Sequence, residues 1–80
     1  MEAGDFFQRE ADAVLRIVRP FQVHGAVFYE IGFSLASDPP DSVRRARVSD
    51  NLVYPDPKPG DRVKIALLMG NVTRIVKTGA

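Results

Sequence analysis

Residues 26–49, "AVFYEIGFSLASDPPDSVRRARVS", decide the fold class of this chain. Along the first half, apolar side chains alternate with small or polar ones, which is typical of a β-strand with one buried face. The apolar face would hold Val27, Tyr29, Ile31, Phe33 and Leu35. The "DPPD" stretch at 38–41 breaks the pattern, and residues 42–49 resume it. The sequence therefore predicts a β-hairpin with strands at 26–37 and 42–49.

The length of the turn sets the register expected for this hairpin. With a four-residue loop at 38–41, Ser37 faces Ser42, and the apolar face of the first strand meets Ala46 and Val48. The further expected pairs are Leu35 with Arg44, Phe33 with Ala46, Ile31 with Val48, Ser34 with Arg45 and Gly32 with Arg47. A slip of one residue would turn every side chain to the other face, so the matching faces favour this register.

Three further strands are expected. β-branched residues favour a strand at 13–19, and Pro20 is expected to end it because proline has no N–H for a ladder hydrogen bond. Residues 62–69 and 72–77 are expected to form a second hairpin. The pair Gly70–Asn71 suits a two-residue turn with a positive φ at the glycine.

Two segments are expected to lie outside the strands. Residues 50–60 hold three prolines within five positions and a glycine, which is typical of a fixed crossing loop. Within that loop, Leu52, Val53 and Tyr54 are free to close one end of the core. Residues 5–11 are expected to form a loose helical turn or an arm.

Five short strands in a chain of 80 residues predict a small β-barrel, which also removes exposed strand edges. The strand order resembles the OB-fold, with residues 50–60 in place of the helix between its third and fourth strands. The stretch "PGDRVKI" at 59–65 resembles the start of a strand in SH3-like barrels. We therefore expect a single all-β domain at 13–78, a five-stranded OB-like or SH3-like barrel, preceded by a short N-terminal arm or helical turn at 1–12.

Composition limits the class of protein. The chain is 45% hydrophobic and 26% charged, as in ordinary globular domains. No apolar stretch approaches the roughly 18 residues that a membrane span needs, and the acidic N-terminus does not resemble a secretion signal. With no cysteine either, we expect a cytoplasmic protein. The net charge of +1 is divided between an acidic half at residues 1–40 and a basic half at residues 41–80.

The chain offers little for catalysis. Its only histidine, His24, stands beside a glycine and has no nucleophile motif near it. A second histidine or a cysteine for a transition-metal site is absent from the sequence. Asp50, Asp56 and Asp61 lack the spacing of a calcium loop, and Asp61 is expected to accept a nearby backbone N–H. There is no glycine-rich phosphate loop. We therefore expect no enzyme, no cofactor and no metal site.

The arginines of "VRRARV", residues 43–48, are the strongest candidates for a binding site. Arg45 and Arg47 would project from one face about 7 Å apart, with Phe28 near enough to stack a base. OB-type barrels commonly bind single-stranded nucleic acid on such a face, so the resemblance implies this function. The expected binding residues are Arg44, Arg45, Arg47, Phe28, Lys64, Arg74 and Lys77. A solvated arginine face, with Glu30 paired to Arg47, explains the same residues, and the low net charge favours it.

The C-terminal hairpin supports a second hypothesis. A two-residue turn at Gly70–Asn71 leaves both faces partly apolar, with Leu68 and Ile75 opposite the main apolar face. Either a β-bulge corrects the second strand, or these two side chains are exposed. In the exposed case the protein would be an assembly subunit, binding a protein partner or a second copy of itself. The expected contact residues are Leu68, Ile75, Phe6 and Phe7.

Overall fold

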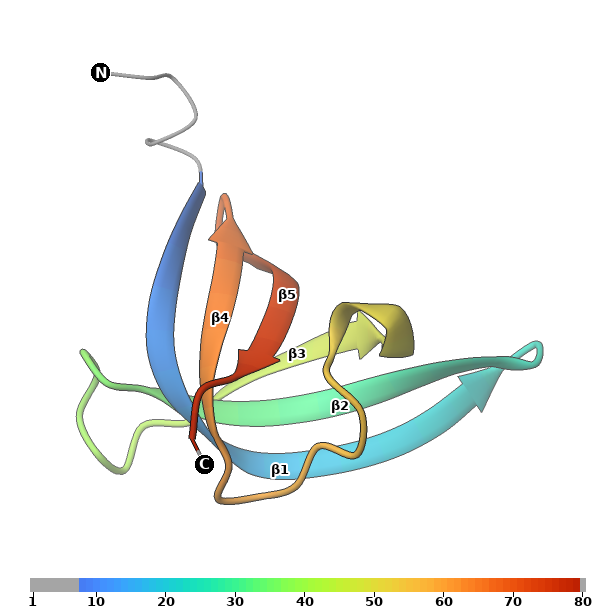
Figure 1. Cartoon of the computed structure of the whole chain (residues 1–80), viewed down its shortest axis with the longest axis horizontal. Coiled ribbons are helices and arrows are strands. Elements are labelled where there is room, and N and C mark those ends of the chain that lie inside the picture. Colours follow the sequence, from blue (N-terminus) through green and yellow to red (C-terminus); the bar gives the residue numbers. More distant parts are fainter. Residues whose placement is uncertain (1–7, 80) are drawn as a thin grey trace.

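The computed structural model describes residues 8–79, and these form one antiparallel sheet of five strands. The strands are β1 (Gln8–Val23), β2 (Ala26–Leu35), β3 (Arg44–Ser49), β4 (Arg62–Leu68) and β5 (Asn71–Lys77), with a single turn of 3₁₀-helix at Asp50–Leu52. Their order across the sheet is β3-β2-β1-β4-β5 (Figure 1). The all-β prediction is confirmed. Within the described residues there is no helix of the length and apolarity that crossing a membrane requires.

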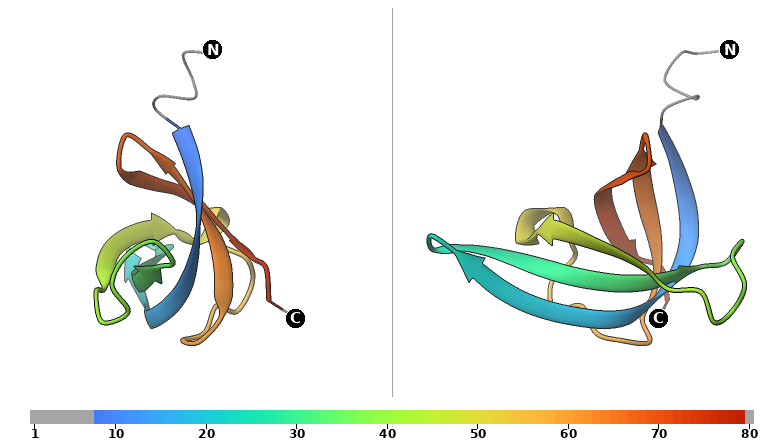
Figure 2. Two further views of the ribbon diagram at one scale, coloured as in Figure 1. Left: turned by 90° about the vertical axis from the view of Figure 1, so that its left-hand side faces the viewer. Right: turned by 180° about the vertical axis from the view of Figure 1, so that it is seen from behind.

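Strand β1 belongs to both halves of the sheet. Its residues 8–14 pair with β4, and its residues 13–23 pair with β2. A β-bulge at Arg16 shifts the register between Leu15 and Ile17. Bulges bend a strand, and the two halves accordingly cross: β4 and β5 stand beside the first part of β1, whereas β2 and β3 follow its second part (Figures 1 and 2).

This long strand corrects two expectations. Residues 8–12 were expected in an arm but form the first part of β1, and residues 1–7 lie outside the described residues. Pro20 does not end the strand; it pairs with Tyr29 in the middle of the β1–β2 ladder. The pairing with β4 ends at Val14, so β1 has a free edge at Pro20, and a free edge is where a strand tolerates proline.

The core lies between the two halves of the sheet. It holds Ala13, Leu15, Ile31, Phe33, Leu35, Val48, Val63, Ile65, Leu67 and Ile75. Of the expected apolar face of β2, Ile31, Phe33 and Leu35 are buried in the core and Val27 and Tyr29 are half-buried, but burial does not alternate, because Gly32 and Ser34 on the other face are buried as well. Because the core fills the space between the halves, the outer face of β1–β2–β3 and the outer face of β1–β4–β5 point away from each other.

The sheet is not closed into a barrel. The outermost strands β3 and β5 come into contact, yet no ladder of hydrogen bonds joins them in the part of the chain that the structure describes. The crossing loop bridges some of this gap, because Val53 forms an isolated parallel bridge with Ile75. Val53 and Tyr54 also pack against the core, as expected.

The β2–β3 hairpin has the expected faces but a register shifted by two residues. Phe33 pairs with Arg44 and Gly32 with Arg45, which also places Glu30 opposite Arg47. The connection is longer than a four-residue loop, because β2 ends at Leu35 and turns follow at 35–38 and 39–42. An even shift keeps each side chain on its face, so the outward direction of Arg45 and Arg47 is unchanged.

A β-bulge resolves the ambiguity of the C-terminal hairpin. The turn lies one residue earlier than expected, at Met69 and Gly70, which have φ values of 52° and 85°. The register then shifts between Ala66 and Leu67, and this shift pairs Ile75 with Ile65 inside the core. Ile75 is only 1% exposed, so the expectation that it forms part of a contact surface is wrong.

Candidate functional site

The outer side of β1, β2 and β3 carries a cluster that we call the arginine face. It is formed by Arg19, Phe21, Phe28, Glu30, Arg45 and Arg47. Strand pairing places these side chains in three adjacent rows. One row holds Phe21 opposite Phe28, and the next holds Arg19, Glu30 and Arg47 across the three strands. Arg45 stands in the third row, opposite Gly32.

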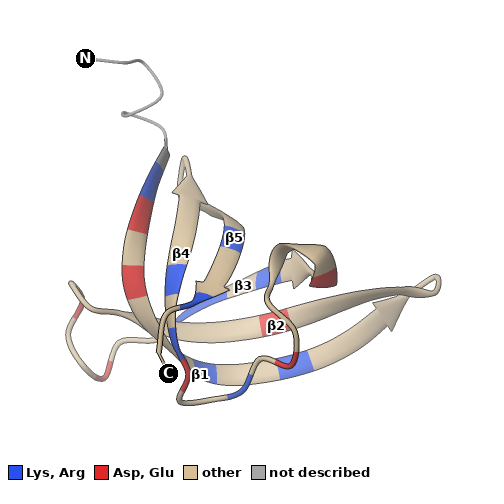
Figure 3. Cartoon of the chain, in the orientation of Figure 1, with Lys and Arg blue, Asp and Glu red and all other residues tan. Residues whose placement is uncertain are grey.

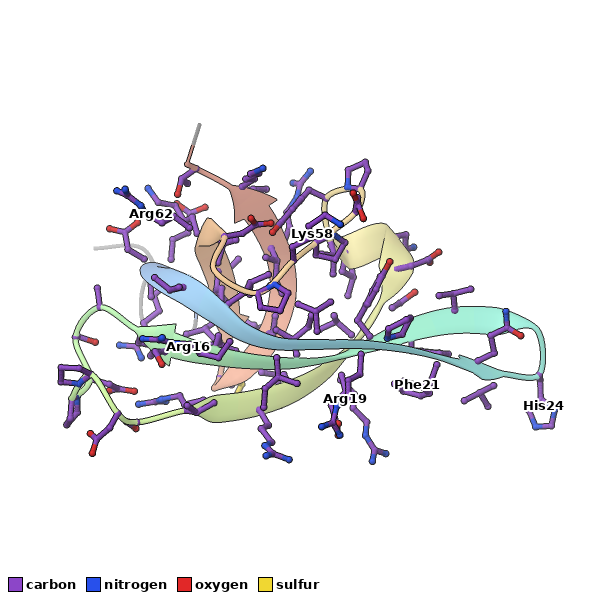
Figure 4. The ribbon with its side chains drawn as sticks, turned by 90° about the horizontal axis from the view of Figure 1, so that it is seen from below. Arg16, Arg19, Phe21, His24, Lys58 and Arg62 are labelled. Atoms are coloured by element: carbon purple, nitrogen blue, oxygen red, sulfur yellow. The ribbon has the colours of Figure 1, made fainter. Side chains whose placement is uncertain are left out.

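Two phenylalanines form the aromatic part of this face. The rings of Phe21 and Phe28 are stacked, with centroids 5.6 Å apart and planes inclined by 21°. The guanidinium carbon of Arg47 lies 5.8 Å from the centre of the Phe21 ring, a cation–π contact. Arg19 and Phe21 project from the same side of β1 (Figure 4). The face therefore combines flat aromatic surfaces with positive charge.

Glu30 is the acid in the middle of the arginine row. Its two carboxylate oxygens lie 3.9 Å from Nη1 of Arg19 and 4.0 Å from Nε of Arg47. These distances exceed those of hydrogen bonds, and the two arginine side chains are 71% and 74% exposed. Loose, exposed ion pairs of this kind contribute about 0–1 kcal/mol. Both guanidinium groups consequently remain available to a ligand.

In the middle of the arginine face, Gly32 has no side chain to project outward. Ile17 of β1 covers it: a Cβ atom at residue 32 would lie 3.0 Å from the Cβ and Cδ1 of Ile17. Beside this position, Arg45 is exposed to solvent. Beyond it, Arg16 at the bulge donates a hydrogen bond to Ser34 at 3.2 Å, and Ser34 donates to the carbonyl oxygen of Ser42 at 2.8 Å.

One hollow lies on the arginine face and a second begins beside it. A small one of about 290 Å³ is lined by Arg19, Pro20, Phe21, Glu30 and Arg47. A larger one of about 530 Å³ begins at Arg16 and Ser34 and continues to Arg62 and Thr78. Its lining mixes Asp12 and Asp38 with the two arginines, so it shows no preference for one sign of charge.

The two halves of the sheet carry different mixtures of charged residues (Figure 3). On the arginine face, Arg19, Arg45 and Arg47 stand against a single acid, Glu30, whereas Arg16 at the bulge shares a hollow with Asp12 and Asp38. The opposite half of the sheet mixes signs, with Asp12 directly across from Lys64. A net charge of +1 for the whole chain therefore conceals a locally basic surface.

The structure brings only some of the predicted binding residues together. Arg45, Arg47 and Phe28 share the arginine face as predicted. Arg44 points away from them and donates to Asp38 at 2.7 and 3.2 Å, a contact that lowers the pKa of Asp38. The register of β4 and β5 puts Lys64 and Arg74 on the outer face of the other half of the sheet.

The remaining predicted residues lie elsewhere. Lys77 pairs with Val63 at the end of β5, away from the arginine face. Leu68 is 43% exposed beside the turn of the β4–β5 hairpin. Phe6 and Phe7 lie outside the described residues. His24 is exposed at the tip of the β1–β2 hairpin, and residues 8–79 contain no group of three His, Asp or Glu that could hold a metal.

Arg19 and Phe21 are the functional candidates that sequence reasoning missed. Both follow the bulge at Arg16. The first strand was predicted to end at Pro20, which lies between them, so they were not assigned to one strand. A signal was present in the sequence. Ile17, Arg19, Phe21 and Val23 are two residues apart, so in a continuous strand they all project from one face, and the residues between them project from the other. Reading the strand through the proline would have placed both on one face.

Comparison of the chain with protein-family models, with curated proteins and with solved structures finds no match.

Proposed function

We propose that this protein is a non-catalytic binding module that takes single-stranded nucleic acid on the arginine face. The observation that carries the proposal is the stacked pair Phe21–Phe28 beside three exposed arginines on one open surface. Bases of a single strand stack on aromatic rings, and arginines beside them bind the phosphates. Double-stranded nucleic acid keeps its bases stacked inside the helix and cannot use Phe21 and Phe28 in this way.

The topology supports the same proposal. We infer that the sheet is an OB-like barrel left open between β3 and β5, with the long bent β1 shared by both halves. OB-folds bind oligonucleotides on the face of their second and third strands, beside the loop that joins their first two strands. In this chain the arginine face occupies those strands, and the long β1–β2 hairpin extends it beyond the core (Figure 2).

Fluorescence anisotropy of a labelled single-stranded oligonucleotide tests the proposal. We expect micromolar binding at low salt that weakens as salt is raised, because phosphate contacts release counterions. The variant Arg45→Ala/Arg47→Ala should weaken binding at least tenfold, in line with losing two charged contacts. The variant Lys64→Ala/Arg74→Ala removes the same charge from the other outer face and is the matched control.

Two outcomes would contradict the proposal. Equal weakening by both double variants would mean that the chain attracts nucleic acid only by its overall charge. Absence of binding at low salt would remove the function altogether. The variant Phe21→Leu separates the contribution of aromatic stacking from that of charge. It keeps an apolar side chain but removes the ring, and it should weaken the binding of a single strand by about five- to tenfold.

A protein contact at the tip of the β4–β5 hairpin is the second candidate function. Leu68 and Met69 are 43% and 73% exposed at this tip, although Ile75 is not available to join them. Two neighbouring apolar side chains form a small patch, which suits a transient contact better than an obligate dimer. Light scattering tests it: a dimer that Leu68→Asp disperses would support this function, and a monomer at all concentrations would oppose it.

A further inference from the structure

Glu30 is out of place in a site that only attracts phosphates. A carboxylate there repels the strand, yet it occupies the centre of the arginine face with its side chain 27% exposed. Neither of its oxygens takes part in a hydrogen bond with any described residue. The carboxylate therefore has two oxygens in loose ion pairs with Arg19 and Arg47, each with room to accept a hydrogen bond from a ligand, beside the ring of Phe21.

A ligand that fits this arrangement must offer donors to Glu30 and acceptors to a neighbouring arginine. Guanine has two adjacent donors, N1–H and the N2 amine, which match the two oxygens of one carboxylate. It also has two adjacent acceptors, O6 and N7, which a guanidinium binds in a bidentate manner. Adenine and cytosine each offer a single amine, and thymine and uracil offer one N–H between two carbonyl oxygens.

We propose that the arginine face prefers guanine among the bases of a single strand, with Glu30 as the residue that selects it. This inference rests on the proposed function and names its preferred ligand. The base stacks on Phe21, where the Arg47 guanidinium now lies 5.8 Å from the ring centre. When guanine stacks on Phe21, it displaces the Arg47 guanidinium from the ring. Arg47 can then bind O6 and N7 of the guanine, while N1–H and the N2 amine of the guanine face Glu30. The hollow lined by Arg19, Phe21 and Glu30 is where it would sit.

Anisotropy with matched oligonucleotides tests the preference. A thymine oligonucleotide with one central guanine should bind about tenfold more tightly than the all-thymine oligonucleotide, as a good bidentate base contact implies. Replacing the guanine by inosine removes the N2 amine alone and should lose most of that gain. In Glu30→Gln the preference for guanine should disappear and all-thymine binding should strengthen, because the amide offers one acceptor oxygen in place of two and no longer repels phosphates.

The controls separate this inference from the function on which it rests. Glu10→Gln, which removes the same charge from the first part of β1, should keep the full preference for guanine. If both oligonucleotides bind equally, the guanine inference fails and the proposed function stands; if neither binds, both fail. A preference that survives Glu30→Gln would also overturn the role of Glu30. Free guanosine monophosphate should compete far more weakly than the strand, and equal competition would assign the hollow to a free nucleotide instead.

Discussion

At the scale of the residue, Gly32 decides whether the arginine face can be flat. Substitution Gly32→Ala would place a Cβ atom 3.0 Å from two atoms of Ile17, one of which is its Cβ and moves only with the backbone of β1. We expect a loss of about 1 kcal/mol in the free energy of unfolding, as overpacking usually costs. Urea denaturation measures it.

A double-mutant cycle identifies the cause of that loss. Ile17→Ala should cost less in the Gly32→Ala background than in the parent, because it removes part of the crowded side chain. Additive costs would show that Gly32 acts through the backbone and not through Ile17.

Tyr54 and Asp61 form a hydrogen-bonded pair whose contribution to stability depends on pH. The phenol donates to Oδ2 of Asp61 at 2.6 Å, and this bond lowers the pKa of Asp61. Burial, and then the contact with the carboxylate, raises the pKa of Tyr54. Because the pKa of Asp61 is lower in the folded state, this carboxylate stabilises the fold above the ordinary aspartate pKa of about 3.9. That stabilisation is lost as the pH falls through the pKa of Asp61 in the folded state. Because the pKa of Tyr54 is higher in the folded state, the neutral phenol stabilises the fold below about pH 10. That stabilisation is lost as the pH rises through the pKa of Tyr54 in the folded state.

Tyr54→Phe should therefore reduce stability most between these limits. We expect the difference in urea midpoint between parent and variant to be largest near neutral pH and to shrink both below about pH 4 and above about pH 10. Asp61 also accepts the backbone N–H of Lys58, at 3.1 Å, as its sequence context predicts, and this bond remains in the variant. A difference that is constant with pH would mean that Tyr54 acts by packing alone.

At the scale of the element, the bulge of the β4–β5 hairpin determines which side chains are buried. Ile75→Ala should cost about 2–4 kcal/mol because it opens a cavity in the core. Leu68→Ala, in the same hairpin, should cost less than about 1 kcal/mol because the side chain is already partly in water. Chemical denaturation of both variants checks this, and equal costs would contradict the register that buries Ile75.

The two hairpins also show what the sequence could and could not predict. Alternation located four of the strands and the side of β2 that carries core residues Ile31, Phe33 and Leu35, because a strand turns successive side chains to opposite faces. The same parity placed Arg45, Arg47 and Phe28 correctly, since the register error of two residues left it unchanged. Loop geometry was not predictable from "DPPD", whose residues take part in two successive turns instead of one tight loop.

Strand β1 was the element that sequence reasoning misjudged most. Its length depends on which of its edges is paired, and that is a property of the whole sheet. Pro20 is acceptable only because β4 leaves β1 before that point, which local sequence does not reveal. Arg19 and Phe21 were lost from the candidate site for this reason. A bulge within the C-terminal hairpin was foreseen as one of two alternatives, and only packing against the core decided between them.

At the scale of the whole molecule, the arginine face limits the length of strand that can bind. From Phe21 to Val14, the outer side of β1 covers eight residues, and the seven steps between them span about 23 Å at the rise of a β-strand. OB-folds occupy about 4–16 nucleotides, and a path of this length belongs at the lower end of that range. Affinity should therefore rise with oligonucleotide length up to about five nucleotides and change little beyond it, apart from the statistical gain of extra binding positions.

The concentration of arginines on one outer face predicts how salt acts on binding. In a thymine oligonucleotide, which has no guanine to engage Arg47, three arginines are positioned to contact phosphates, so log Kd against log salt should have a slope near 2, at about 0.7 per contact. Arg45→Ala/Arg47→Ala should lower that slope by about 1.4, whereas Lys64→Ala/Arg74→Ala should leave it nearly unchanged. Titrations at several salt concentrations measure both. Because the two variants have the same net charge, a slope that falls equally in both would show that the strand responds to the charge of the whole chain, and not to the face on which the arginines lie.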